Sequence, residues 1–338
     1  MITGSLPALQ TVDHLSISDA DLTGFSLPRL TGITLNLSQI RCRELARPFK
    51  ALQTAGRWAV TFTDQDGKSY PAVGEFRQQG AEVTGTFLTP TGDHRYLAGE
   101  LRERRLRLSK FDGGHPFLYE ATLGADGTLR GQYWSGLAWT ERFTAHRDDA
   151  ASLGEAEQAT QMKAGATRLD FRFPDLGGVF VSLSDPFYRG KVVLVTLAGS
   201  WCPNCHDEAA FLAPLYREYR GKGLEIVALM FEQFGDFERA AEATHRFRAR
   251  YQVDYQTLIA GISDKDDAAT RLPQLNGVFA FPTTIFIDRA GVVRRLHTGF
   301  SGPATGEHYA RLTADFRHTI DALLAEPGPT PPLPTPPR

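Results

Sequence analysis

Residues 201–206, Trp-Cys-Pro-Asn-Cys-His, contain the side chains of this chain that are best suited to covalent chemistry. Their spacing fits two kinds of site. With His206 included, Cys202 and Cys205 match the pattern that attaches a c-type haem; without it, they form a Cys-x-x-Cys redox dithiol. The first interpretation predicts an electron carrier with a coloured cofactor, and the second predicts a thiol enzyme without one.

The residues around the motif favour the dithiol. A c-type haem needs a second axial ligand, commonly methionine, but Met162 falls in an expected linker and Met230 in an expected core strand. The motif also stands between a strand-like run and a helix-like segment, which is the thioredoxin-like context of a Cys-x-x-Cys pair. A zinc ion needs four ligands, and the adjacent Cys205 and His206 rarely reach one ion together. We therefore expect no cofactor and no metal site.

A dithiol at this place in the chain has a physical basis. Cys202 falls at the start of a predicted helix, where unpaired backbone N–H groups and the helix dipole stabilise a thiolate. Cys205 lies one turn further along and can attack a mixed disulfide formed at Cys202. The alternative is a static disulfide that is never reduced.

Strands and helices alternate on both sides of the motif. The apolar run at 192–198 predicts a strand of a parallel sheet that is covered on both faces. The sequence predicts, in order, a strand at 190–199, a helix at 207–219, a strand at 224–231, a helix at 236–251, a hairpin at 283–299 and a helix at 308–326. This order is typical of an α/β domain.

The chain before this domain has a different pattern. From Trp58 to Ala145, hydrophobic and polar residues alternate with a period near two, interrupted by Gly-rich turns. Short strands at such spacing predict an all-β antiparallel barrel or sandwich, to which the first 57 residues are expected to add strands. We expect an antiparallel β domain at 1–147, a linker at 148–166, an α/β domain at 167–326 and a disordered Pro-rich tail at 327–338.

Composition limits the classes of function. The 338 residues are 42% hydrophobic and 22% charged, as in an ordinary globular protein. The net charge of -2 gives no reason to expect nucleic acid or an anionic membrane as a partner. The longest apolar run is too short to span a bilayer, so we expect no transmembrane segment. The N-terminus lacks the pattern of a signal peptide, which leaves a cytoplasmic location or an export segment missing from this chain.

Residues 170–300 resemble the TlpA/ResA-like thiol-disulfide oxidoreductases of the thioredoxin superfamily. The resemblance rests on the segments FRFPDLGG, VSLSD, GKVVLVTLAGSWCPNCHDE, the Glu of LMFE, and FPTTIFIDRAGVV, which occur in the expected order. It implies a thioredoxin-like fold and a dithiol–disulfide exchange that needs no cofactor. It also implies protein thiols or disulfides as substrate and a redox partner that supplies or removes electrons. Members are often exported or lipid-anchored and often carry an added N-terminal β domain, which suggests the periplasm or the cell envelope.

The resemblance also implies roles for individual residues. Cys202 would be the nucleophile and Cys205 the resolving thiol. Pro282 falls on the cis-proline that faces the redox motif and leaves backbone groups free to hold a substrate chain. The expected substrate-binding residues are Trp201, Pro203, Asn204, Phe281, Pro282 and Thr283.

Two positions depart from the family pattern. Thioredoxins place a buried Asp five residues before the motif Trp, where this chain has Thr196, and many relatives have a helix-kinking Pro where this chain has Ala210. Without that Asp, another group must carry the proton of Cys205. Glu232 ends a predicted strand at the sheet edge where ligands sit, and burial would raise its pKa toward neutrality. We therefore expect Glu232 to act as acid and base; the alternative is a solvated Glu at the entry of a loop.

Other functions stay open at this point. Cys202 could reduce peroxide, as in a peroxiredoxin-like thiol peroxidase, although the nearby second Cys favours exchange. The β domain could bind a ligand while the dithiol is vestigial, or the chain could deliver a metal such as copper. Cys42 is expected to be a lone structural or surface thiol.

Overall fold

A computed structural model describes residues 53–112, 115–137, 139–153 and 159–328. The chain forms two compact units. The first contains the described residues up to Tyr70 together with 74–85 and 96–151, and the second contains 71–73, 86–95 and the chain from Ser152 onwards. The strands expected before residue 53, Cys42 and the tail from residue 329 lie outside the described residues.

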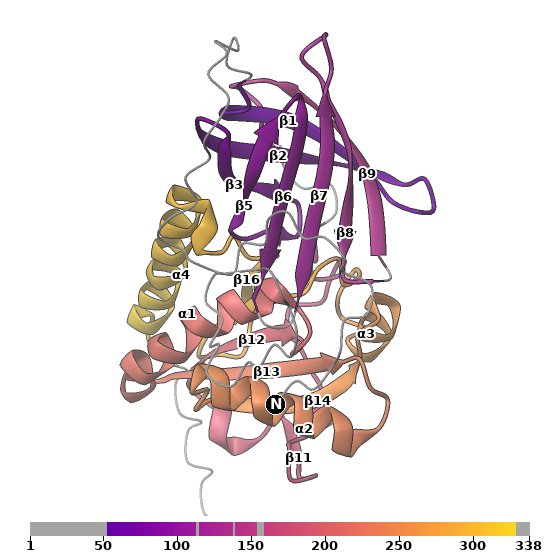
Figure 1. Cartoon of the computed structure of the whole chain (residues 1–338). Helices are drawn as coiled ribbons and strands as arrows, with labels where there is room; N and C mark the ends of the chain where they lie inside the picture. The colour runs from indigo at the N-terminus through magenta and orange to yellow at the C-terminus, as the bar shows by residue number, and fades with distance from the viewer. Residues whose placement is uncertain (1–52, 113–114, 138, 154–158, 329–338) are drawn as a thin grey trace, which may run out of the picture. The chain divides into compact units, whose positions relative to one another are not determined.

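An antiparallel sheet accounts for the alternating pattern of the first part of the chain (Figure 1). Its strands are β1 (Gly56–Thr63), β2 (Ser69–Gln79), β3 (Glu82–Thr89), β4 (Gly92–Asp93), β5 (Leu97–Arg102), β6 (Arg105–Phe111), β7 (Pro116–Leu123), β8 (Leu129–Ser135) and β9 (Trp139–Arg147). The strand order is β2-β1-β9-β8-β7-β6-β5-β3-β4, and β2 also pairs with β3. That additional pairing closes the sheet into a barrel, which confirms the predicted antiparallel β class.

Aromatic side chains fill the barrel. Tyr119 is buried and stacks on Tyr133 with the ring centroids 4.6 Å apart, and Phe62 packs on Phe143 at 5.5 Å. The buried carboxylate of Glu141 accepts a hydrogen bond of 2.6 Å from the Tyr70 hydroxyl. Along every strand of a barrel, residues that point into the core alternate with residues that point outward. This alternation explains the period of two in the sequence.

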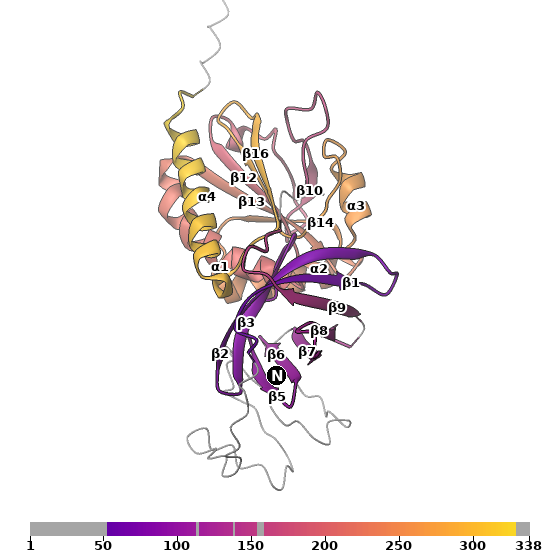
Figure 2. The same ribbon diagram turned by 90° about the horizontal axis from the view of Figure 1, so that it is seen from above.

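The second unit has a thioredoxin-like fold (Figure 2). Its elements are β10 (Arg172–Pro174), β11 (Phe180–Ser182), β12 (Val192–Ala198), α1 (Pro203–Tyr219), β13 (Leu224–Glu232), α2 (Phe237–Tyr251), β14 (Gln256–Ile262), α3 (Lys265–Arg271), β15 (Thr283–Ile287), β16 (Val293–Thr298) and α4 (Glu307–Ala325). The main sheet has the order β14-β13-β12-β15-β16. The strands and helices predicted around the motif are confirmed, except that α1 begins at Pro203 rather than at residue 207. β10, β11, β14 and α3 were not predicted.

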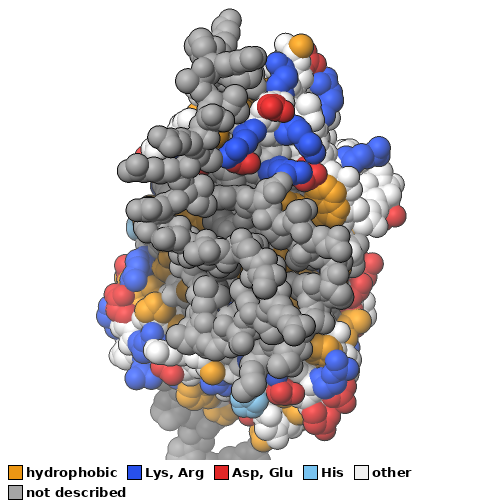
Figure 3. Space-filling model, viewed as in Figure 1, with side chains coloured by type: hydrophobic (Ala, Val, Ile, Leu, Met, Phe, Trp, Pro, Cys, Tyr) orange, Lys and Arg blue, Asp and Glu red, His pale blue; other side chains and the backbone are white. Residues whose placement is uncertain are grey.

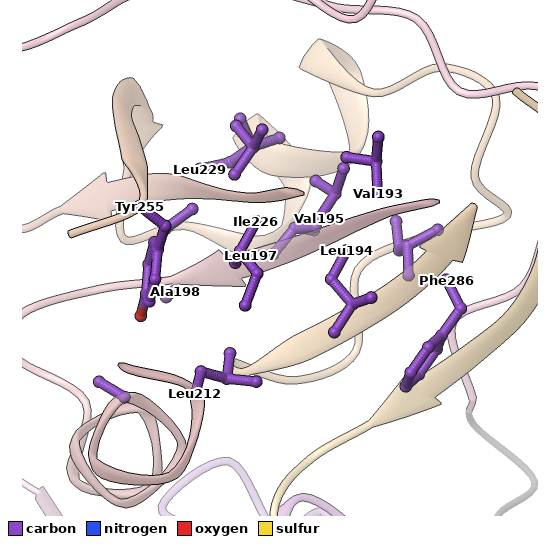
Figure 4. Packing of buried hydrophobic residues seen from close by; sticks show 14 of the residues in the cluster. Val193, Leu194, Val195, Leu197, Ala198, Leu212, Ile226, Leu229, Tyr255 and Phe286 are labelled. Carbon is purple, nitrogen blue, oxygen red and sulfur yellow. The ribbon is translucent and has the colours of Figure 1, made fainter. Parts of the chain in front are cut away.

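The strand before the redox motif lies in the middle of this sheet. All seven residues of β12 are buried; the strand pairs in parallel with β13 and antiparallel with β15. Figure 4 shows Leu194 directed to the side of the sheet where Leu212 of α1 lies, and Val193 directed to the opposite side. A strand covered on both faces needs apolar residues at every position, which explains the uninterrupted apolar run.

Two successive crossovers place α1 and α2 together. The chain passes from β12 through α1 to β13, and from β13 through α2 to β14, each time to the next parallel strand. Such connections are right-handed, so both helices lie on one face of the sheet. They touch there, with the rings of His206 and Phe247 5.1 Å apart.

The surface carries charges of both signs. Figure 3 shows basic and acidic side chains interspersed on the described part of one face, with hydrophobic side chains between them. This distribution fits the net charge of -2. Within the described residues, no helix is long and apolar enough to cross a membrane.

Candidate active site

Cys202 and Cys205 lie at the start of α1 and form a disulfide, with their Cα atoms 5.2 Å apart. Cys202 is the N-cap of the helix, and its Sγ accepts a hydrogen bond of 3.2 Å from the backbone N–H of Cys205. Pro203 follows at the first helical position, where the backbone N–H has no partner within the helix, so proline loses no helical hydrogen bond there. Both sulfurs are buried within the described structure. In the dithiol form, the same N–H and the helix dipole can stabilise a Cys202 thiolate.

Phe281 and Pro282 face Cys202. The Phe281–Pro282 peptide bond is cis, as the resemblance implied, and Cys202 Sγ lies 3.3 Å from the Phe281 carbonyl oxygen. The rings of Phe281 and Trp201 make an edge contact at 5.8 Å, and Trp201 Nε1 donates to the Phe231 carbonyl at 2.8 Å. The structure thus brings Trp201, Cys202 and the proline loop together.

Thr283 and Asn204 use their side chains within the protein. Thr283 is buried, and its hydroxyl donates to the Ala280 carbonyl at 2.8 Å. The Asn204 amide donates to the carbonyl oxygens of Asp93 at 3.0 Å and Phe300 at 3.3 Å. In this disulfide form, the polar groups of both side chains are therefore engaged within the protein.

A buried carboxylate lies beside the dithiol, at a residue that the sequence did not single out. Glu208 is 1% exposed and follows Cys205 by three residues on α1, which puts both side chains on the same face of the helix. Its Oε2 accepts a hydrogen bond of 2.5 Å from the Thr196 hydroxyl, and its Oε1 accepts one from the Thr284 hydroxyl. Burial raises the pKa of Glu208 to about 7. Thr196 stands where thioredoxins have a buried Asp. In this protein the carboxylate of Glu208, from α1, lies next to Thr196 instead.

Glu232 is buried and supports the loop that precedes the motif. Its carboxylate accepts hydrogen bonds from the Ser200 N–H at 2.9 Å and the Ser200 hydroxyl at 2.6 Å, and the Thr244 hydroxyl lies at 3.4 Å. With an exposed fraction of 1%, Glu232 is not the solvated loop residue considered as the alternative. Burial raises its pKa above the ordinary value. Its role as acid and base stays a prediction.

Both ring nitrogens of His206 form hydrogen bonds next to the motif. Its Nε2 lies 2.7 Å from the Ser200 carbonyl oxygen and its Nδ1 lies 2.7 Å from the Tyr251 hydroxyl. A carbonyl can only accept, so Nε2 donates and Nδ1 of the neutral ring accepts from Tyr251. Ser200 is consequently held from both sides, by Glu232 and by His206.

The comparisons with known proteins concern this second unit. A family model described as Redoxin matches residues 163–310. The thiol-disulfide oxidoreductase ResA of Geobacillus thermodenitrificans is 32% identical over 142 residues, which cover 42% of this chain and 73% of that protein. The chain belongs to the ResA-like thiol-disulfide oxidoreductases. It is therefore an oxidoreductase of the thioredoxin superfamily, as the resemblance implied.

Two further proteins are similar to this ResA-like oxidoreductase. ResA of Bacillus cereus is 29% identical over 140 residues, which cover 41% of this chain and 72% of that protein. A solved thiol:disulfide interchange protein from Chlorobium tepidum is 17% identical with a TM-score of 0.37, covering 47% of this chain and 97% of that one. The family match begins at residue 163, after the last barrel strand.

Proposed function

We propose that this oxidoreductase exchanges dithiol and disulfide with protein thiols through Cys202 and Cys205. The observation that carries the proposal is the position of Cys202 as N-cap of α1, with the Cys205 N–H directed at its sulfur. This arrangement favours a thiolate at Cys202. Cys205, buried one turn into the helix, then serves as the resolving thiol.

The exchange proceeds in two displacement steps. In the reducing direction, the Cys202 thiolate attacks one sulfur of a client disulfide, which releases one client thiolate and forms a mixed disulfide. Cys205 then loses its proton and attacks Cys202 Sγ, which releases the second client thiolate and forms the Cys202–Cys205 disulfide. Two electrons pass from the enzyme to the client, and the reverse sequence oxidises a client dithiol.

Glu208 is the group that we propose as proton acceptor for Cys205. A carboxyl with a pKa of about 7 can both accept and donate a proton near neutral pH. Its hydroxyl partners, Thr196 and Thr284, stabilise the carboxylate without carrying a charge of their own. The backbone beside Pro282, with Trp201 and Phe281 next to it, is the proposed contact for the client chain.

Trapping of clients tests this function. Cys205→Ser should start exchange but fail to resolve it, so mixed disulfides with client proteins should accumulate and be released by reductant. The experiment uses a Cys42→Ser background, so that only motif thiols remain, with Cys202→Ser as the matched control. If Cys202→Ser traps the same clients instead, the roles of the two thiols are reversed. If neither variant traps a client, the chain is a binding module with a vestigial dithiol.

A further inference from the structure

A short segment far upstream in the chain lies against the redox motif within the second unit. Residues 86–95 belong to this unit, and Gly92 forms a parallel β-bridge with Phe300. Asn204, between the two cysteines, donates its amide to the Asp93 carbonyl at 3.0 Å. The segment Thr91–Arg95, called here the flanking segment, is therefore in direct contact with the Cys-x-x-Cys sequence.

Two glycines allow this close approach. A Cβ atom at Gly92 would lie 2.7 Å from Asn204 Cγ, and a Cβ atom at Gly299 would lie 2.7 Å from the carbonyl carbon of Thr91. Both glycines also have positive φ, 144° and 82°, which larger residues rarely adopt. The flanking segment therefore packs so closely that neither glycine has space for a Cβ atom.

Charged side chains hold the flanking segment in place. Asp93 is 2% exposed, and its Oδ1 accepts a hydrogen bond of 2.6 Å from the Gly302 N–H. Its Oδ2 accepts a bond of 2.8 Å from the Arg95 N–H. The Arg95 guanidinium donates to the Asp207 carboxylate of α1 at 2.7 Å. Charge-assisted bonds of this kind are stronger than neutral ones, so the segment is fixed both to α1 and to the loop after β16.

We propose that the flanking segment is a specificity element of the dithiol. It occupies the Asn204 side of the motif as a built-in strand, so that a client polypeptide reaches Cys202 only along Trp201 and Phe281. This proposal rests on the proposed exchange with protein disulfides, and it specifies which disulfide substrates can reach Cys202. A small disulfide needs no room for flanking chain, whereas a polypeptide must place residues on both sides of its cysteine. The segment therefore discriminates against polypeptide clients that extend toward Asn204.

The test compares two disulfide substrates on the full-length protein. The ratio of kcat/KM for insulin to kcat/KM for oxidised glutathione is measured for the parent and for Gly92→Ala. The new Cβ meets Asn204 and should displace the segment, and we expect the ratio to rise at least about threefold. Gly67→Ala is the matched control, because Gly67 also has a positive φ of 84° but nothing within 4 Å of the added Cβ. Its ratio should equal that of the parent.

A second variant covers the case in which Gly92→Ala fails to fold. Asp93→Asn keeps the shape of the side chain but removes the charge that attracts the Arg95 N–H, and the ratio should rise in the same direction. A lower melting temperature with an unchanged ratio would mean that the segment is only structural, and a lower ratio would mean that it helps to bind clients; either result overturns the proposal. If the parent acts on neither disulfide, the proposed function itself fails.

Discussion

Glu208 differs from the acidic residue that the sequence suggested, and the two can be separated by experiment. Glu208 lies on the same helix face as Cys205, and both of its oxygens accept bonds from uncharged hydroxyls. Both oxygens of Glu232 bind Ser200 instead. We therefore propose Glu208, which shares the helix face of Cys205, as the proton carrier, and Glu232 as the residue that positions the loop.

The pH dependence of exchange tests this difference. Burial raises the pKa of Glu208 to about 7, so the carboxylate that we propose as acceptor for the proton of Cys205 forms as the pH rises through neutrality. The kcat/KM of the parent should therefore rise with pH around 7. In Glu208→Gln this rise, the limb of the pH profile near pH 7, should disappear. The value of kcat/KM should also fall at least about tenfold, since general acid–base assistance is worth about a hundredfold or more.

Two further variants complete the comparison. Glu232→Gln should lose less activity and keep the limb near pH 7, and Glu242→Gln, on the exposed face of α2, should match the parent. If Glu232→Gln removes the limb while Glu208→Gln keeps it, the original expectation for Glu232 is correct and the assignment to Glu208 is wrong.

The elements around the site were largely predictable, and the exceptions have physical reasons. The apolar run of β12 and the pattern of α2 identify a covered sheet and its helix directly. Pro203 at the first helical position is a known start signal, and Cys202 was expected at the start of this helix, but the helical pattern of apolar residues itself begins only at residue 207. The helix α3 has only seven residues and β14 is an edge strand, so neither carries a long periodic pattern.

Contacts between elements were not predictable. That Glu208 follows Cys205 by three residues is visible in the sequence, but that this face of α1 packs on Thr196 and Thr284 requires the folded sheet. The bond between Asn204 and Asp93 joins residues 111 positions apart, and no local pattern indicates it.

His206 links α1 to α2 and to Ser200, so its removal should lower the stability of the protein. His206→Ala removes two hydrogen bonds of 2.7 Å, so we expect the free energy of unfolding to fall by about 1 to 3 kcal/mol in urea titrations. His245→Ala, at an exposed position of α2, is the control and should change it by less than about 0.5 kcal/mol. Equal effects of the two substitutions would contradict the linking role of His206.

For the whole molecule, the sequence predicted a linker at 148–166 between two separate domains. The second compact unit contains the chain from Ser152 onwards and also the upstream segments 71–73 and 86–95. A polar linker can be predicted from composition. Which compact unit contains a segment that lies far away in the sequence depends on tertiary contacts.

Cleavage within 148–166 tests the consequence. The segment 86–95 then stays on the N-terminal fragment, so we expect the two fragments to co-elute in size-exclusion chromatography. The isolated fragment 152–338 should melt at least about 5 °C lower than the nicked pair, because it loses the bonds of Asp93 and Arg95. Free separation with unchanged melting and activity would support the sequence-based expectation of independent pieces instead.

A redox titration of the purified protein shows whether Cys202 and Cys205 form a redox-active pair. We expect one reversible two-electron transition with a midpoint between about -270 and -120 mV, the range of thioredoxin-like enzymes. A value near the first limit would indicate a reductant, and a value near the second an oxidant. The transition should be absent in Cys202→Ser. A midpoint below about -300 mV, which is typical of structural disulfides, would contradict the account.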